Sequence, residues 1–322
     1  SRFLDGALNN TLRLAYSFQN EDRDHYGDVF PTVDILEPID DTQNGVITSF
    51  GLDPFTYGNL KQVSTVIATD EINYSVGINN IIAGFQFEWD GVKNGYMQGG
   101  AGYYTYNSWD DFVNNRTPAA FAITFPNNDE LEQVYPSFQY MQASLYAQDE
   151  ITFSDRFKLT AGVRLELPVY PTVPNNNNVE FATLADNSQT MQGLRTDDMP
   201  NARLAVSPRV GFNWNILGNR NLILRGGTGI YTGRIPFVWI VSSVGNSNTV
   251  QLQYIDNNGG PAFHKDIAGI VNELYGGRFT RQEGFAPSSP TIMDKHLKMP
   301  TTWKTSLALD ARLPGGIKAT LE

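Results

Sequence analysis

Cysteine is absent from this 322-residue chain, and histidine is rare, with only His25, His264 and His296. Without cysteine there is no disulfide framework, no thiolate nucleophile and no cysteine-ligated metal. The three histidines also lack the i, i+4 spacing of a zinc-binding helix. These absences exclude cysteine enzymes and most metalloenzymes. Because no other catalytic constellation stands out, we assign no catalytic residue, no metal and no cofactor, and expect no enzyme activity.

Basic residues are outnumbered, with 23 Lys and Arg against 34 Asp and Glu, and the formal net charge is -11. An acidic chain repels polyanions, and no run of Lys or Arg is present that would release counterions from a nucleic acid. A nucleic-acid partner is therefore excluded.

Long hydrophobic runs are missing as well. A membrane-spanning helix needs ~18 or more consecutive apolar residues. The longest comparable stretch here is short and lies around Phe237 to Val241. The chain is therefore not expected to be a helical membrane protein.

Aromatic residues and glycine are plentiful, with 19 Phe, 15 Tyr, 5 Trp and 29 Gly. This mixture disfavours helices and suits strands joined by turns. In Thr11 to Gln19, apolar and polar residues alternate with a period of two, so that one face is apolar and the other polar. The pattern recurs in residues 81–90, 157–167, 209–216, 222–230 and 303–312. We therefore predict an all-β protein of two-faced strands.

The connections between these strands alternate between short and long. Residues rich in turn formers predict tight turns at 9–10, 77–80, 154–156, 218–220 and 314–316. The intervening loops, residues 20–62, 91–136, 168–203 and 232–299, far exceed the ~4–6 residues usual in compact domains. About ten strands follow, the first (residues 1–8) and the last (residues 317–322) cut short.

Short turns at one end, long loops at the other and two-faced strands are typical of a transmembrane antiparallel β-barrel. A soluble sandwich or propeller is the alternative, because its strands also alternate. Two carboxylates count against the barrel, since Asp70 and Asp149 fall on the more apolar faces of their strands. A β-bulge or a position near the membrane interface would accommodate them.

Several segments carry a resemblance to a known family. Leu145–Glu150 followed by Leu159–Arg164 resembles the paired barrel-strand motif of TonB-dependent outer-membrane transporters. Ser207–Phe212, Arg225–Trp239 and Met299–Trp303 resemble the Oar-like branch of that family. The first pair is generic to the superfamily, whereas the stretch from Thr228 to Trp239 within the second set is more specific to the branch.

The resemblance implies a barrel of 22 strands with a plugged lumen, of which residues 1–322 form part, without the plug domain or the N-terminal segment. A complete small barrel is the rival interpretation. Such a protein lies in the outer membrane of a Gram-negative bacterium and contacts its lipids. Through the plug it engages a periplasmic TonB-type energy transducer and imports a bulky nutrient. The alternative is a structural or partner-binding role, in which the loops hold a surface lipoprotein or surface layer and nothing is transported.

Ligand contacts are expected in two long loops, Gly91–Phe112 and Thr232–Asn258, which combine aromatic rings with Asn and Gly. Within them we predict Tyr104, Trp109 and Arg234 as substrate-binding residues. The alternative for the rings is the aromatic girdle that such barrels carry at the membrane interface.

Other polar residues receive structural interpretations. The lumen-facing arginines are expected to pair with Glu88, Glu166 and carboxylates of the plug; they are Arg13, Arg164, Arg209, Arg225 and Arg312. The glycine-rich stretch Arg225–Gly229 lacks the following Lys-Ser/Thr of a phosphate loop, so close strand packing is the better explanation.

Overall fold

The computed structural model describes residues 2–3, 7–39, 44–171, 173 and 175–322. Its largest element is an antiparallel sheet of ten strands, here called the wall, in the order β1-β2-β5-β6-β9-β10-β11-β12-β14-β15. The wall strands are β1 (Arg2–Phe3), β2 (Leu8–Asp22), β5 (Leu60–Val76), β6 (Asn79–Gly95), β9 (Ser137–Ser154), β10 (Phe157–Val169), β11 (Ala205–Asn215), β12 (Leu222–Thr232), β14 (Thr301–Arg312) and β15 (Lys318–Leu321). Residues 1 and 4–6 of the predicted first strand lie outside the described residues. The large antiparallel sheet is confirmed.

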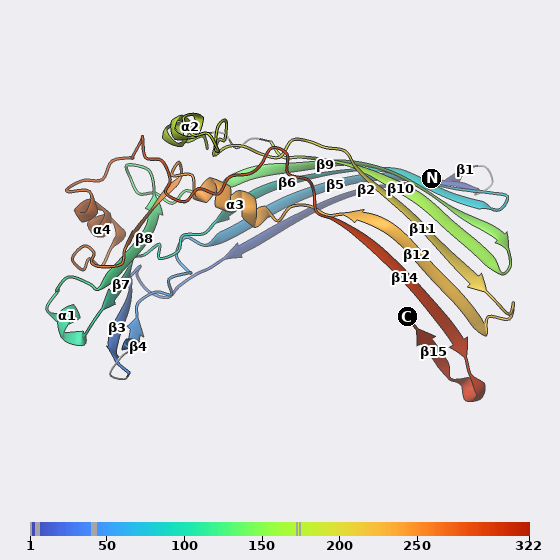
Figure 1. Ribbon diagram of the computed structural model, residues 1–322, viewed down its shortest axis with the longest axis horizontal. Coiled ribbons are helices and arrows are strands. Elements are labelled where there is room, and N and C mark those ends of the chain that lie inside the picture. The colour runs from blue at the N-terminus through green and yellow to red at the C-terminus, as the bar shows by residue number, and fades with distance from the viewer. Residues whose placement is uncertain (1, 4–6, 40–43, 172, 174) are drawn as a thin grey trace.

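Short connections gather at one end of the wall (Figure 1). Gly77 and Ile78 alone join β5 to β6, and Gly77 has a φ of +58°, a left-handed conformation that glycine adopts without steric penalty. The predicted turns at 77–80, 154–156, 218–220 and 314–316 are confirmed. The prediction of a turn at Asn9–Asn10 is wrong. Both residues lie inside β2 and pair with Asn73 and Ile72 of β5, because strand pairing overrides the local turn preference of asparagine.

The register of the wall aligns the apolar faces of its strands. One row across five neighbouring strands consists of Leu14, Ala68, Phe87, Ala143 and Leu167. This face is open to the surroundings, and the Leu14 side chain is 75% exposed. An exposed apolar surface of this extent indicates contact with another apolar phase. The prediction of two-faced strands is therefore confirmed.

Asp70 and Asp149 do lie on the apolar face of the wall. Asp70 stands between Leu12 and Phe85 and accepts a hydrogen bond from Asn10 Nδ2 at 2.7 Å. Asp149 pairs with Ile81 of β6 in an unbroken register. Neither carboxylate sits at a bulge, so that explanation is wrong. Both lie toward the short turns, as a position near the membrane interface requires.

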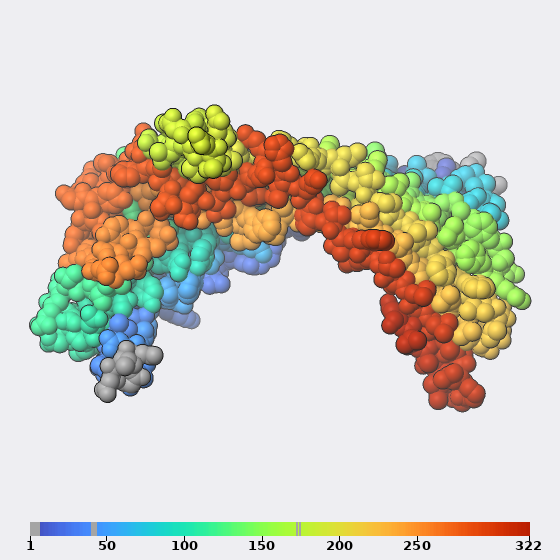
Figure 2. All heavy atoms as spheres, viewed as in Figure 1, coloured from blue at the N-terminus to red at the C-terminus, as the bar shows by residue number. Residues whose placement is uncertain are grey.

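The wall is an open, strongly curved sheet rather than a closed cylinder. Figures 1 and 2 show it as an arch that is hollowed on one side. The strands β1 and β15 form its two edges. The ten strands therefore form one curved sheet with two edges, whose apolar and polar faces are separated.

A second sheet of five strands, here called the cap, lies at the end of the wall opposite the short turns (Figure 1). Its strands follow the order β13-β8-β7-β3-β4 and all come from the long loops. They are β3 (Thr32–Pro38), β4 (Asn44–Phe50), β7 (Tyr103–Tyr106), β8 (Ala120–Pro126) and β13 (Gln251–Asp256), with the helices α1 (Trp109–Val113) and α4 (Ile267–Leu274) beside them.

The cap has a hydrophobic core of its own. Its buried residues are Val33, Ile35, Tyr104, Tyr106, Phe121, Ile123, Phe125, Leu252, Ile270, Val271 and Phe279. Three of the long loops predicted from the sequence thus contain strands of a folded sheet. Because Tyr104 and Tyr106 lie in this core, these two rings are not part of an interfacial girdle.

A second core joins the end of the wall to the helix α3 (Phe237–Gly245) and to the segment around α2 (Val179–Asp186). Ile240, Val241 and Val244 of α3 pack there with Val92 of β6 and Tyr140 of β9. Among the described residues, no helix combines the length and hydrophobicity that a membrane crossing by a helix requires.

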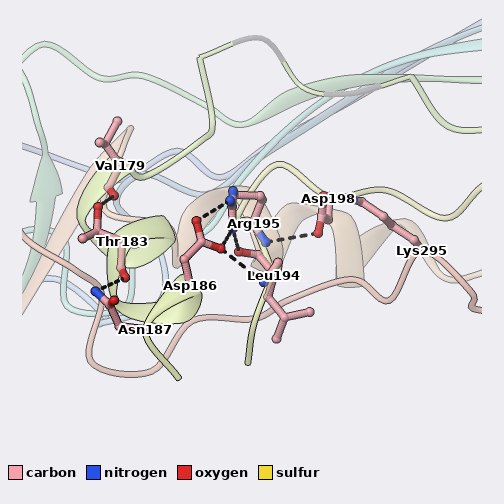
Figure 3. Close-up of polar contacts among 9 residues, drawn as sticks. Val179, Thr183, Asp186, Asn187, Leu194, Arg195, Asp198 and Lys295 are labelled. Carbon is pink, nitrogen blue, oxygen red and sulfur yellow. Dashed lines mark hydrogen bonds and ion pairs between the residues drawn. The ribbon is translucent and has the colours of Figure 1, made fainter. Parts of the chain in front are cut away.

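One ion pair joins the segment around α2 to the segment between α4 and β14, and another lies within the α2 segment itself (Figure 3). Arg195 donates to both carboxylate oxygens of Asp186, at 2.9 and 2.7 Å. Asp198 accepts from the Arg195 backbone N–H at 3.1 Å and pairs with Lys295 Nζ at 2.9 Å. Two loops distant in sequence are thereby held together.

Candidate functional site

Arg234 lies between β12 and α3, in a segment that folds back across the polar face of the wall. Its Nη2 donates to Glu88 Oε1 at 2.7 Å and its Nη1 donates to Asp90 Oδ2 at 3.0 Å. Both carboxylates belong to β6 and are buried. Since β9, β10 and β11 separate β6 from β12 in the sheet, the contact spans several strands. The guanidinium also lies 5.2 Å from the ring centroid of Tyr140.

The charge of Arg234 is stabilised by its carboxylate partners, which suits a structural role that fixes one segment to another. Burial of its guanidinium opposes the charged form, but the hydrogen bond to Glu88 and the charge of Asp90 outweigh this effect and raise the pKa of Arg234. Asp90 accepts a further bond from the Thr65 hydroxyl. The two carboxylates engage both terminal nitrogens of Arg234, which thereby holds the start of α3 on the wall.

Polar side chains continue across the same face of the wall. Gln142 accepts a hydrogen bond from the Tyr140 hydroxyl and donates to Glu166 at 3.2 Å. Arg164 donates to Glu166 at 2.9 Å and to Gln86 at 3.3 Å. The expected pairing of Glu166 with a strand arginine is confirmed. Glu88 is paired by Arg234 instead, because the segment before α3 reaches it from above the sheet.

Tyr104 lies in the core of the cap, with 0% of its surface exposed. Its ring packs against Phe121 with centroids 4.6 Å apart, and its hydroxyl donates to the carbonyl of Ala262 at 3.1 Å. Burial raises the pKa of the Tyr104 phenol above its usual value. A side chain in this position stabilises the cap and presents no surface to a ligand.

Trp109 occupies the first turn of α1 at the edge of the cap and is 52% exposed. Its ring packs edge-on against Phe50 with centroids 6.0 Å apart and against Phe112 at 5.7 Å. Trp109 and Tyr104 therefore belong to one aromatic cluster in the cap. Arg234 lies in the other core, beside Tyr140 and Phe237.

A cavity of about 510 Å³ lies where the cap, the wall and α3 meet. Its wall side comes from Asn94 and Tyr96 at the end of β6, its helical side from Val241 and Ser242 of α3. The cap contributes Thr124, Gln251 and Gln253. The turn after α3 contributes Asn246 and Asn248, and the segment between α4 and β14 contributes Ser288 and Ser289. Most of this lining comes from the two loops in which ligand contacts were expected, although none of the three predicted contact residues takes part.

The cap supplies its part of this lining through strand alternation. In β8 and β13 the residues Phe125 and Leu252 point into the cap core, whereas Thr124 and Gln253 are direct partners on the opposite face. Gln251 lies two residues from Gln253 on that same face. One face of the cap is therefore apolar and packed, and the other is polar and faces the cavity.

The turn that follows α3 is held rigidly beside the cavity. Asn178 donates to the carbonyl of Ser247 at 3.0 Å, and Ser247 Oγ donates to Asn176 Oδ1 at 2.8 Å. From the other side, Asn127 at the end of β8 donates to the carbonyl of Asn248 at 3.0 Å. Side-chain amides thus fix the backbone at this rim and preorganise the cavity.

The carboxylate pairs of the loops serve local contacts. Arg116 pairs with Asp110 and Asp111, each at 2.9 Å, and Lys295 pairs with Asp198. Within the part of the chain that the structure describes, no three His, Asp or Glu side chains form a group suited to a metal ion.

One family model matches nearly the whole chain. Residues 5–322 match the family model described as outer membrane beta barrel domain. No curated protein matches the chain. Among solved structures, the chain is similar to the outer membrane transporter YddB from Escherichia coli, with 13% sequence identity and a TM-score of 0.45. The match covers 95% of this chain and 30% of the YddB chain.

The family match spans both the wall and the cap. Proteins of this family reside in the bacterial outer membrane and are not typically enzymes. The apolar face of the wall is then the surface that meets lipid. From residue 5 to residue 322, the chain belongs to the family of outer membrane beta barrel domains.

Proposed function

We propose that the chain is the barrel portion of a TonB-dependent outer-membrane receptor that imports a bulky nutrient. The observation that carries this proposal is the position of the cavity, between the cap and the polar face of the wall. With the long loops directed outward, a ligand captured there already stands at the mouth of the lumen. The resemblance of Arg225–Trp239 to the Oar-like branch supports the same function.

In this proposal the ten strands of the wall are part of a barrel of 22 strands, whose lumen holds a plug domain. The periplasmic transducer acts on the plug, and the wall remains a passive scaffold. Trp109 is retained as a proposed ligand contact because its ring is half exposed at the cap edge. Arg234 acts as a positioning residue, and Tyr104 acts through packing.

The mass of the intact native polypeptide tests the proposal first. Import requires a plug domain, so the native polypeptide should be longer than 322 residues. Uptake is then compared in cells with and without the energy transducer, and it should stop when the transducer is removed. A native polypeptide bounded by Ser1 and Glu322, or uptake independent of the transducer, would contradict import.

A structural or partner-binding role is the alternative, and the edge of the cap favours it. Ile39, Val46 and Ile47 are exposed around β4, which is the edge strand of the five-stranded sheet. Such an edge accepts a further strand from another chain, for example from a surface lipoprotein. Replacement of Val46 and Ile47 by Asp should then release the lipoprotein from the membrane. Under the import proposal, the same replacement leaves uptake unchanged.

A further inference from the structure

The cavity between the cap, the wall and α3 has an unusual lining. Of its 17 residues, seven carry side-chain amides and four carry aliphatic hydroxyls. Among the described residues that line it, none is a Lys, Arg, Asp, Glu or His. An anionic ligand, such as a phosphate or a carboxylate chelate of iron, requires a cation or a positive dipole to offset its desolvation. The lining therefore selects an uncharged occupant.

Two polar atoms of this lining lack partners. Thr124 Oγ1 and Gln251 Oε1 are buried without a hydrogen bond from any described residue, in side chains whose residues are 3% and 7% exposed. The Gln251 Nε2 atom donates to the carbonyl of Tyr96 at 3.4 Å, which leaves its oxygen as an unused acceptor. Because an unpaired buried polar atom is costly, an occupant of the cavity that supplies these partners is favoured.

The remaining features match a sugar rather than a peptide. Each side-chain amide offers both donors and an acceptor, and each hydroxyl offers one donor and two acceptor lone pairs, which suits the adjacent hydroxyl groups of a sugar ring. The Tyr96 ring is partly exposed at the cavity and provides an apolar surface for the C–H face of such a ring. The volume of about 510 Å³ falls within the ~300–1,000 Å³ typical of ligand pockets.

We propose that this cavity binds a neutral oligosaccharide, with Thr124 and Gln251 hydrogen-bonding to sugar hydroxyls and Tyr96 packing against a sugar ring. The inference deepens the proposed import function by naming its substrate class, and it rests on that function for its physiological meaning. The rigid turn around Ser247 holds the cavity in shape before the ligand arrives.

The test measures binding to the full-length native protein in detergent. The probes are an array of neutral hexose oligosaccharides, uronic-acid oligomers of the same lengths, and uncharged peptides with blocked ends. Neutral oligosaccharides should bind, and the other two classes should not. Thr124→Val, Gln251→Ala and Tyr96→Ala should each weaken binding by about 3- to 10-fold, the effect of one lost contact. Gln189→Ala, at an exposed position outside the cavity, is the matched control.

Thr124→Val keeps the shape of the side chain and removes only the unpaired hydroxyl, so the thermal midpoint of the variant should not fall. Stronger binding of acidic oligomers or peptides, no binding of any neutral oligosaccharide, or unchanged affinity in both Thr124→Val and Gln251→Ala would each overturn the proposal. Uptake of the bound sugar is then followed with and without the transducer. Binding without transducer-dependent uptake would refute import and leave the ligand class standing.

Discussion

The wall and the cap are two β-sheets of the same chain with opposite relations to their surroundings. In the wall, apolar side chains such as Leu14 and Trp303 point outward and remain exposed. In the cap, Tyr104, Tyr106 and Phe121 are packed in a closed core. In both sheets apolar and polar residues alternate along the strands, so the same sequence pattern produces a lipid-facing surface in one and a packed hydrophobic core in the other.

The difference lies in what covers the apolar face. Wall strands are up to 18 residues long and pair with sequence neighbours, which leaves their apolar face to the bilayer. Cap strands are at most seven residues long and gather from separate loops around their own core. The wall therefore depends on lipid for its stability, whereas the cap depends on side-chain packing.

The largest effect is expected in the core of the cap. Tyr104→Ala should lower the free energy of unfolding of the cap by about 3–5 kcal/mol, because it leaves a cavity where a large ring was packed. Limited proteolysis should then cut the cap loops while the β-signal of the wall in circular dichroism persists. Tyr26→Ala, at a fully exposed tyrosine, is the control and should have little effect. Loss of wall and cap in one step would show that the two sheets are not distinct in stability.

Charge on the lipid-facing surface should have the next largest effect. Leu14→Arg and Val163→Arg should each cost about 2–4 kcal/mol of membrane-inserted stability if these residues lie near the bilayer midplane. Arg13→Leu changes the neighbouring residue on the polar face and should be tolerated. A refolding titration into lipid vesicles measures both. Equal tolerance of arginine on the two faces would eliminate the barrel interpretation.

Loss of the anchor between wall and loop should cost less. Arg234→Met leaves Glu88 and Asp90 buried without their cation, and we expect a loss of about 1.5–3 kcal/mol. A double-mutant cycle with Glu88→Gln isolates the pairwise part, since the glutamine needs no cation. If Arg234→Met costs as much with Glu88→Gln as without it, the ion pair does not hold α3 in place.

The smallest effect concerns the cap at acidic pH. Burial opposes ionisation of Glu273, but bonds from the Ala262 N–H and from His264 outweigh it and lower the pKa of Glu273 below 4.5. Because the folded pKa is depressed, this stabilisation is present above pH 4.5 and is lost as the pH falls through the folded value. The carboxylate is partly exposed, so the contribution is below about 1 kcal/mol. In thermal unfolding, Glu273→Gln should destabilise the cap at pH 7 and have no effect near pH 3. A pH-independent cost would contradict this account.

The wall could be predicted from the sequence because its pattern is repeated and local. A period of two that continues through residues 157–167 and 209–216 specifies both the strands and their faces. The local failure at Asn9–Asn10 arose where pairing with β5 overrode a turn signal. The cap escaped prediction because its strands are short and their partners are remote, as when Leu252 pairs with Phe125.

The two segments in which the sequence analysis expected ligand contacts supply most of the cavity lining, but the three residues it named do not line the cavity. Loops 91–112 and 232–258 both line the cavity. Their Asn, Gln and aromatic residues were the signal, because such side chains form surfaces that are polar and yet can pack against other parts of the protein. Tyr104 was misleading because an aromatic residue in a loop gives the same signal whether it packs in a core or meets a ligand. Thr124 and Gln251 carry no signal in the sequence, because only the pairing of β8 with β13 brings them together.

The pairing of β8 with β13 also sets an order of events during folding. Wall hairpins such as β5–β6 close a turn of two residues, whereas the cap cannot complete its sheet until the chain beyond β12 has returned to β8. Closing so long a loop carries a large entropic cost and slows the step. Refolding should therefore proceed in two phases. The wall hairpins form in a fast phase, and the five-stranded sheet of the cap is completed in a slow phase. The cavity appears only at the end of the second phase, so ligand binding reports the completion of folding.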